Sequence, residues 1–301
     1  MYDIGIVGGG TAGLTAAIYG QRAGKKTIVF EGTAYGGQIS SSARVENYPG
    51  IAVISGFEFS MNLSEQAKSL EAELVSAQVQ EIRKEGENFL VTTSRGDYIC
   101  KTVILATGMT HRHLGLEKEK HLTGSGVSYC ATCDGAFFRG SDVAVIGGGN
   151  TALQDALFLS AYCSKVYLVH RRDEFRGEDR LVEQLRKKEN VEFIMSAVVK
   201  DISGKFMVDG VILNNKKTGE DFTIPVSGIF VAVGQIPGNE NFADIVELDE
   251  NGFIRAGEDC VTSCPGIFAA GDCRTKEIRQ LVTAAADGAA AALAACKYIR
   301  M

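Results

Sequence analysis

The chain has 301 residues, 45% hydrophobic and 23% charged, which is the composition of a globular protein and excludes both intrinsic disorder and a fibrous fold. At roughly 150 residues per domain, this length predicts two domains. The 31 basic and 37 acidic side chains give a net charge of −6, which offers nucleic acid no general attraction. Eight cysteines are too few for a disulfide scaffold, whereas 35 glycines against 4 prolines suggest that the backbone approaches a ligand.

The sequence predicts no contact with a membrane. No run reaches the roughly 18 uncharged apolar residues that a membrane helix needs. The Ala-rich stretch from Thr283 to Cys296 is short and carries Asp287. The N-terminus passes from Tyr2 and Asp3 directly into an apolar strand, without a basic leader or a small-residue cleavage site. A cytoplasmic location is therefore expected.

The first segment of the chain is typical of a dinucleotide-binding unit. An apolar strand over 3–7 runs into Gly8-Gly9-Gly10-Thr11-Ala12-Gly13, and a helix over 14–22 leads to a second strand over 26–30 that ends at Glu31. The first glycine of the motif permits a tight turn, the second admits a pyrophosphate and the third lets the helix lie close to the strand. The acid can bind ribose hydroxyls. The alternative is a glycine-rich turn that binds nothing.

The same pattern recurs in the middle of the chain. A strand over 142–146 precedes Gly147-Gly148-Gly149-Asn150-Thr151-Ala152, and a helix to about residue 161 leads to a strand over 165–169. At the distance beyond the motif where the first copy has its acid, this copy has His170-Arg171-Arg172, with Arg176 one helical turn further. Exchanging a carboxylate for guanidinium groups suits a 2′-phosphate, and therefore NADP rather than NAD. A solvated basic face is the alternative.

Three later strands predict how the two units are connected. Residues 102–105, ending in Ala106-Thr107-Gly108, and residues 228–233 each close one unit. A last strand over 266–269 ends near Asp272, where ligands bind in open α/β sheets, so it belongs with the first unit. We therefore expect an α/β fold with two Rossmann-like domains of the three-layer ββα type, the second inserted into the first. The predicted boundaries are 1–111 and 243–301 for the first domain and 112–242 for the second.

The most chemically distinctive segment is Cys130-Ala131-Thr132-Cys133-Asp134-Gly135. A C-x-x-C spacing suits a disulfide that opens and closes, because the two sulfurs stay within bonding reach. The acid that follows can move protons to and from a departing thiolate. A zinc site that also uses Cys260 and Cys264 is one alternative, and plain buried cysteines are another. The two dinucleotide motifs around the segment favour redox chemistry, and no metal is expected.

Taken together, these motifs make the sequence resemble the low-molecular-weight, bacterial-type thioredoxin reductases of the class II pyridine nucleotide-disulfide oxidoreductases. The similarity runs essentially from end to end. Besides the two glycine motifs and the C-x-x-C segment, it rests on Gly36-Gly37-Gln38, Glu46-Asn47-Tyr48-Pro49-Gly50, Ala106-Thr107-Gly108, His170-Arg171-Arg172, Gly271-Asp272 and Arg279-Gln280. The resemblance implies a homodimeric NADPH-dependent thioredoxin-disulfide reductase. Electrons would pass from NADPH through FAD and the Cys130–Cys133 disulfide to thioredoxin or a thioredoxin-like protein.

The resemblance also implies roles for single residues. Cys133 is expected to face the flavin, Cys130 to attack the thioredoxin disulfide and Asp134 to act as the acid–base group. The expected FAD-binding residues are Gly8, Gly9, Gly10, Thr11, Ala12, Gly13, Glu31, Gly37, Gln38, Asn47, Val79, Ala106, Thr107, Gly108, Asp272, Arg279, Gln280 and Leu281. The expected NADPH-binding residues are Gly147, Gly149, Asn150, Thr151, His170, Arg171, Arg172 and Arg176. The family alternates between two domain orientations, and the two chain crossings are the natural hinges.

Two positions depart from the family pattern, and several related activities remain as alternatives. Gln154 stands where many members carry Glu, and Gly177 stands where Ala is usual. Ferredoxin-linked thioredoxin reductases have lost the second fingerprint that this chain keeps. The flavoprotein of peroxide-reducing systems has an extra N-terminal thioredoxin-like module, and flavin-dependent ferredoxin–NADP reductases lack the C-x-x-C. A non-catalytic flavin-binding redox sensor would need no second nucleotide site.

Overall fold

The computed structural model describes residues 1–42 and 45–300, with only the backbone for Ser41 and Cys133. This part of the chain divides into two compact units, of which unit 1 is Met1–Thr110 with Ile236–Met301 and unit 2 is His111–Gln235. The second crossing therefore comes before the expected boundary at residue 242. The reason is that Phe242 is buried in the core of unit 1, where it packs with Val79.

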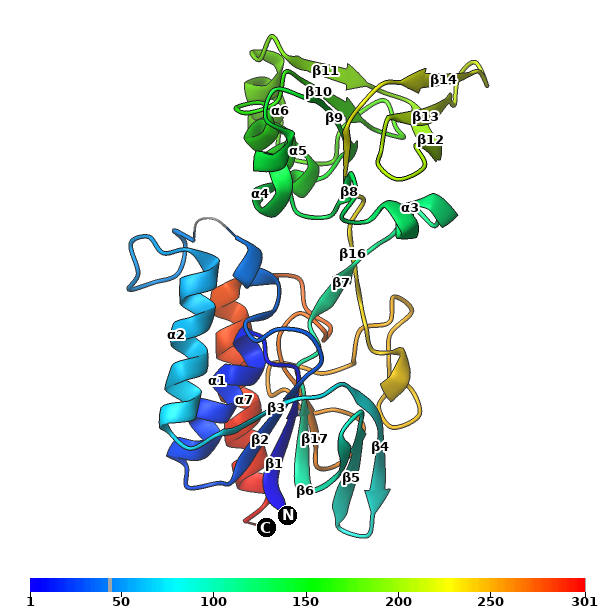
Figure 1. Ribbon diagram of the computed structural model, residues 1–301. Coiled ribbons are helices and arrows are strands. Elements are labelled where there is room, and N and C mark those ends of the chain that lie inside the picture. The colour runs from blue at the N-terminus through cyan, green and yellow to red at the C-terminus, as the bar shows by residue number, and fades with distance from the viewer. Residues whose placement is uncertain (43–44, 301) are drawn as a thin grey trace. The chain divides into compact units, whose positions relative to one another are not determined.

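Unit 1 is built from three layers (Figure 1). A parallel layer has the strand order β3-β2-β1-β6, and β17 pairs with the C-terminal half of β6. The N-terminal half of β6 pairs instead with β5 in an antiparallel layer that continues to β4. Helices α1, α2 and α7 cover the other face. The parallel pairing of Phe268 with Ile104 confirms that the last strand belongs with the first unit.

The side chains of the central strands alternate between the two neighbouring layers, as the period of two requires. Ile28 and Phe30 pack toward the antiparallel layer, whereas Val29 packs toward the helices. The elements of unit 1 are β1 (Tyr2–Val7), α1 (Thr11–Arg22), β2 (Thr27–Glu31), the 3-10 helix η1 (Gly37–Ser41), α2 (Gly56–Ser69), β3 (Glu73–Ser76), β4 (Val79–Glu85), β5 (Asn88–Thr93), β6 (Gly96–Leu105), η3 (Glu240–Phe242), β17 (Ile267–Ala269) and α7 (Leu281–Tyr298).

Unit 2 repeats the three layers. Its parallel sheet has the order β11-β10-β9-β15-β8, one face of which packs on the antiparallel strands β12-β13-β14 and the other on helices α5 and α6. Its elements are α3 (Glu117–Leu122), β8 (Val127–Ser128), α4 (Ala131–Asp134), η2 (Gly135–Phe138), β9 (Asp142–Gly147), α5 (Asn150–Leu159), β10 (Lys165–Val169), α6 (Asp179–Arg186), β11 (Val191–Ile194), β12 (Ala197–Ser203), β13 (Gly210–Asn215), β14 (Asp221–Ile224) and β15 (Gly228–Ala232).

The chain passes between the units through two short strands, β7 (Met109–His111) and β16 (Gln235–Pro237), which pair with each other. The repeated three-layer architecture confirms the predicted α/β fold of two Rossmann-like units. Among residues 1–42 and 45–300, no helix combines the length and the hydrophobicity needed to cross a membrane.

Candidate functional site

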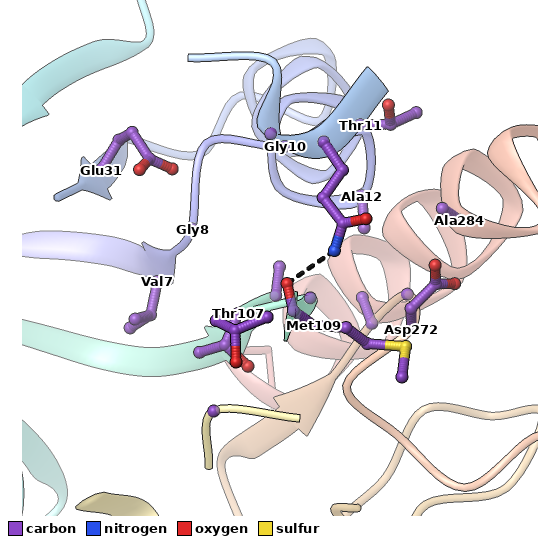
Figure 2. A pocket seen from close by; sticks show the side chains of 18 of the residues that line it. Val7, Gly8, Gly10, Thr11, Ala12, Glu31, Thr107, Met109, Asp272 and Ala284 are labelled. Atoms are coloured by element: carbon purple, nitrogen blue, oxygen red, sulfur yellow. Dashed lines mark hydrogen bonds between the residues drawn. The ribbon is translucent and has the colours of Figure 1, made fainter. Parts of the chain in front are cut away.

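Unit 1 contains a cavity of about 730 Å³ at the carboxyl ends of its parallel strands, where ligands bind in open α/β sheets (Figure 2). Most of the residues expected to bind FAD line it. They are Gly8, Gly10, Thr11, Ala12, Glu31, Gly37, Gln38, Asn47, Val79, Ala106, Thr107, Gly108, Asp272, Arg279, Gln280 and Leu281. Gly9 and Gly13 do not line it, because Gly9 packs against Tyr35 and Glu31 and Gly13 packs against the carbonyl of Gly8.

The glycine loop between β1 and α1 leaves no room for side chains except on the cavity side. Gly8 has φ +106°, and a Cβ there would overlap the carbonyl oxygen of Ala106. A Cβ on Gly13 would overlap the carbonyl oxygen of Gly8, so glycine lets α1 begin directly against the turn. On Gly10, by contrast, the nearest atoms would be 3.9 Å away. The exposed backbone at Gly10 and the N-terminus of α1 therefore fit a pyrophosphate.

Glu31 closes the same loop from the end of β2. Its Oε2 accepts a hydrogen bond from the Gly9 amide at 2.7 Å, and its Oε1 accepts from the amide and hydroxyl of Thr33. Since a carboxylate has about four acceptor positions, it can accept one more donor. Glu31 lines the cavity (Figure 2), so a ribose hydroxyl can supply that donor.

Asp272 lies on the opposite side of the cavity with an unused acceptor. Its Oδ1 is buried and finds no hydrogen-bond donor among the described residues. Burial raises the pKa of this carboxyl, and the charges of Lys276 and Arg279 partly oppose the rise. A buried carboxylate oxygen without a donor is costly, so Oδ1 calls for a donor from a ligand. Together with the glycine loop and Glu31, this observation fits FAD.

A buried ion pair holds the turn that carries Asp272. Arg274, only 1% exposed, donates to Asp287 on α7 through Nε and Nη2, both at 2.9 Å. Asp287 also accepts from the amide of Gly271 at 2.9 Å and from Lys276 at 2.8 Å. These bonds lower the pKa of Asp287 against the effect of its burial. The carboxylate therefore stays ionised and fixes the backbone directly before Asp272.

Sequence reasoning missed part of the cavity wall. Met109 accepts a hydrogen bond from Gln38 Nε2 through its carbonyl at 2.7 Å (Figure 2), which links the segment after β6 to the segment after β2. The missed residues mostly follow strand ends, a position that could have pointed to them. They include Phe30, Gly32, Thr33, Ala77, Gln78, Met109, Thr110, Asn241 and Phe242.

The glycine loop of unit 2 has the same construction. A Cβ on Gly147 would overlap the carbonyl oxygen of Ala232 in the neighbouring strand β15, whereas a Cβ on Gly149 would meet nothing within 4 Å. A Cβ on Gly148 would overlap the ring of His170. Gly149 and the N-terminus of α5 therefore present open backbone, as Gly10 does in unit 1.

His170 lies inside the fold. It is 5% exposed, and its ring stacks on Phe175 with the centroids 5.5 Å apart. Burial is the main cause that lowers the pKa of His170, and the neighbouring arginines add to the decrease. A neutral, buried imidazole suits support of the glycine loop better than contact with a phosphate. Arg171, Arg172 and Arg176 are exposed and free to reach an anion.

The loop that carries Arg176 is fixed on the start of α5. The amides of Arg176 and Gly177 both donate to the carbonyl of Gly148, at 2.8 and 3.2 Å. Asn150 accepts from the amide of Glu178 at 2.8 Å and donates to its carboxylate at 3.2 Å. A Cβ on Gly177 would come within 2.9 Å of Asn150 Oδ1. This close packing explains the glycine at a position where the family usually has alanine. Nothing in the structure explains Gln154.

The C-x-x-C segment begins at the end of β8 and forms the short helix α4. Cys130 is disulfide-bonded, whereas Cys100, Cys163, Cys260, Cys264, Cys273 and Cys296 are free thiols. The side chain of Cys133 lies outside the described part of the chain. The carbonyl of Cys130 accepts from the amide of Asp134 at 3.1 Å, and its Sγ is 3.3 Å from the hydroxyl of Thr132.

The buried free thiols of unit 1 are unreactive. Burial raises the pKa of both Cys100 and Cys260 to about 12, which keeps them protonated. Cys260 donates through Sγ to the carbonyl of Asp287 at 3.5 Å within unit 1. Among the described side chains, no three His, Cys, Asp or Glu residues lie close enough together to hold a metal ion.

Comparison with known proteins agrees with this geometry. Residues 2–288 match the family model of the pyridine nucleotide-disulphide oxidoreductases. The thioredoxin reductase of Mycolicibacterium smegmatis is 42% identical over 301 residues, which cover 99% of this chain and 97% of that protein. The crystal structure of the Lactococcus lactis thioredoxin reductase superposes with a TM-score of 0.92 at 40% identity, covering 100% of this chain and 99% of that one.

The chain belongs to the thioredoxin reductase family. It is also 42% identical to the bifunctional thioredoxin reductase/thioredoxin of Mycobacterium leprae over 302 residues, which are 99% of this chain and 66% of that longer protein. Thioredoxin reductases of this family contain FAD and depend on NADPH. The family membership and the two-unit fold predicted from the sequence are thus confirmed.

Proposed function

We propose that this chain is an NADPH-dependent thioredoxin-disulfide reductase. One observation carries the proposal. The unit with the second glycine loop and its exposed arginines also holds Cys130, disulfide-bonded at the start of a C-x-x-C motif with Asp134 close behind it. Membership of the thioredoxin reductase family supports the same substrate class.

We assign FAD to unit 1 and NADPH to unit 2. In unit 1, the glycine loop would hold the pyrophosphate, Glu31 a ribose and Asp272 a donor group of the flavin. In unit 2, Gly149 and the N-terminus of α5 would hold the pyrophosphate, while Arg171 and Arg176 would bind the 2′-phosphate. When bound, the two cofactors supply hydride transfer and a two-electron carrier. The domain assignment would place both redox-active cysteines in the NADPH unit.

The cysteines then exchange the electrons with thioredoxin. The Cys130 thiolate attacks one sulfur of the thioredoxin disulfide, that S–S bond breaks, and Asp134 supplies the proton for the departing thiolate. Cys133 next gives its proton to Asp134 and attacks Cys130 in the mixed disulfide, which re-forms the Cys130–Cys133 bond. The second thioredoxin sulfur leaves as a thiolate and takes that proton from Asp134. Two electrons and two protons have then moved to thioredoxin. The family resemblance supports this order of the two cysteines.

Anaerobic titration tests the cofactor assignment. NADPH should bleach the absorbance of bound FAD stoichiometrically, whereas NADH should do so only at much higher concentration. Bleaching by reduced ferredoxin but not by NADPH would support the ferredoxin-linked alternative, against which the retained second glycine motif argues. If neither donor bleaches the flavin, the remaining interpretation would be a non-catalytic, flavin-binding redox sensor.

Two cysteine variants test the thiol roles. Cys130→Ser leaves Cys133 free, and should show a broad long-wavelength charge-transfer band with oxidised FAD. Cys133→Ser should lack that band but trap a mixed disulfide with a thioredoxin that has lost its resolving cysteine. Both variants should accept a hydride from NADPH, and neither should turn over thioredoxin. Cys264→Ser, which changes a free thiol in unit 1, is the matched control and should keep turnover.

The opposite result for the charge-transfer band or for thioredoxin turnover would change the proposal. A charge-transfer band in Cys133→Ser would exchange the two roles, and retained turnover in either variant would remove this pair from the reaction. A homodimer and a cytoplasmic location also belong to the proposal. The mass of the holoenzyme in solution tests the first, and fractionation of the source cell tests the second.

A further inference from the structure

Ser128 connects the two ends of the redox segment, although sequence reasoning gave it no role. It is the last residue of β8 and is 5% exposed. Its Oγ lies 2.6 Å from Asp134 Oδ2, and it accepts a hydrogen bond from the amide of Cys130 at 3.0 Å. The carbonyl of Cys130 is further away, at 3.3 Å.

The hydroxyl has one proton, so only one of its partners can receive it. The bond to Asp134 is the shorter, and a carboxylate is a stronger acceptor than an amide carbonyl. Ser128 therefore donates to Asp134 while its lone pair accepts from Cys130. A single buried hydroxyl joins the expected acid–base group to the backbone of the expected nucleophile.

The position of this hydroxyl is fixed by its surroundings. Ser128 pairs with Phe230 in the parallel sheet of unit 2. The next residue, Tyr129, donates to the carboxylate of Glu119 at 2.8 Å, and Glu119 is only 2% exposed. Glu119 also accepts from the amides of Leu114 and Gly115. Both residues before Cys130 are thus held, which prevents the loop from carrying the hydroxyl away from Asp134.

We infer that Ser128 is a positioning residue for Asp134 in the thiol exchange. Its hydrogen bond holds the Asp134 carboxylate on the same hydroxyl that receives the amide of Cys130, which fixes the carboxylate relative to the C-x-x-C segment. This inference rests on the proposed function, in which Cys130 and Asp134 act on thioredoxin. It adds a residue that sets when Asp134 takes and gives its proton.

The test is the pH dependence of a single turnover. Holoenzyme is reduced beforehand with limiting NADPH and mixed with oxidised thioredoxin, and the formation of thioredoxin thiols is followed in a stopped-flow instrument. First, Asp134→Asn identifies the limb of the pH–rate profile that depends on Asp134. In Ser128→Ala, the midpoint of that limb should differ from the wild-type midpoint by about one pH unit, because Asp134 has lost the hydroxyl that holds its carboxylate. The KM for NADPH and the reduction of FAD should stay unchanged.

Matched variants separate this role from a general effect of losing a buried hydroxyl. Ser160 is also buried in unit 2, but its hydroxyl donates to the carbonyl of Leu157 at 2.8 Å. Ser160→Ala should leave the midpoint unchanged. Ser128→Thr keeps the hydroxyl and should keep the wild-type midpoint, whereas its isostere Ser128→Val should behave like the alanine variant. If the alanine variant fails to fold, the comparison of Ser128→Thr with Ser128→Val still tests the role of the hydroxyl. In the Asp134→Asn background, Ser128→Ala should have no further effect on the profile.

The outcomes distinguish this inference from the proposed function. An unchanged midpoint in both Ser128→Ala and Ser128→Val, with turnover abolished in Cys130→Ser, would overturn the role of Ser128 and leave the function standing. Equal shifts in Ser128→Ala and Ser160→Ala would also overturn it. Full turnover in Cys130→Ser would remove the proposed function itself.

Discussion

The two glycine loops of this protein are built alike but closed by different side chains. In unit 1, the amide of Gly9 donates to the carboxylate of Glu31. In unit 2, the corresponding Gly148 lies against the ring of His170. Burial lowers the pKa of His170, so this buried ring is uncharged at neutral pH. The residue at the end of the second strand therefore supports the loop in both copies.

The difference teaches where nucleotide specificity can arise. In unit 1, the supporting residue is itself charged and lines the cavity, so Glu31 is placed both to support the loop and to accept from a ligand hydroxyl. In unit 2, His170 faces inward, and the neighbouring Arg171 and Arg172 carry the charge at the surface. A repeated backbone device can thus serve two dinucleotides when only the side chains after one strand change.

The largest effect is expected at the third small residue of each motif. Gly13→Ala places a Cβ on the carbonyl oxygen of Gly8, and neither backbone segment can yield without opening the loop. We expect loss of bound FAD, and we expect the free energy of unfolding of unit 1 to decrease by about 1–3 kcal/mol. In unit 2, the corresponding residue is already Ala152, so Ala152→Gly should cost only about 1 kcal/mol, as glycine does in a helix.

Flavin absorbance per protein and urea unfolding of both variants measure this asymmetry. Cofactor loss restricted to Gly13→Ala would sharpen the comparison. Full FAD content in Gly13→Ala would mean that the loop of unit 1 does not approach the pyrophosphate as closely as its geometry indicates.

A smaller effect is expected from the exposed arginines of unit 2. Changing Arg171 and Arg176 together to Ala removes two charge-assisted contacts, each worth roughly 1.5–3 kcal/mol. Steady-state kinetics should show the KM for NADPH rising tenfold or more, while the KM for NADH hardly changes because NADH has no 2′-phosphate. Lys187→Ala combined with Lys188→Ala, at the end of α6, is the charge-matched control and should alter neither value. Equal losses with both cofactors would contradict the assignment of the 2′-phosphate.

The smallest effect concerns the pH dependence that His170 gives to unit 2. Because burial lowers the pKa of His170 in the folded state, the unfolded chain binds more protons between the folded value and the ordinary value near 6.5. Stability is therefore fully present above about pH 6.5 and decreases as the pH falls toward the folded value. Urea midpoints of unit 2, followed by a probe in that unit, should decrease over this range in the wild type. They should decrease less in His170→Gln, which does not titrate. An identical slope in both proteins would assign the acid sensitivity to other groups.

Local patterns in the sequence were enough to predict the repeated architecture. Continuous apolar runs predict buried parallel strands, and the two runs that end in a glycine motif also predict the helix that follows. The structure has β1, β2, β9 and β10 where those runs lie. The glycines at positions 8 and 147 were predictable because no other residue fits so close to a neighbouring strand. The membership of β17 in unit 1 was also predictable, since Asp272 follows that strand.

Other features depended on contacts between residues far apart in the chain. Sequence reasoning placed the end of the inserted unit at residue 242, but burial of Phe242 against Val79 assigns residues 236–242 to unit 1. It also treated His170 as a ligand-binding residue, whereas the packing around Gly148 and Phe175 places the imidazole inside. No local sequence pattern predicts either contact, because the burial of a side chain depends on the distant segments that pack against it.

By itself, the sequence determined the residues of the glycine loops, the C-x-x-C segment and the exposed basic positions, because backbone sterics and spacing act over a few neighbouring residues. Only the tertiary structure decided which polar atoms meet. It brings Ser128 to Asp134, and it joins Arg274 on one loop to Asp287 on α7 beside the cavity of unit 1. A hydrogen bond needs two atoms within about 3 Å. That distance is set by the packing of whole layers, which the order of residues along the chain does not display.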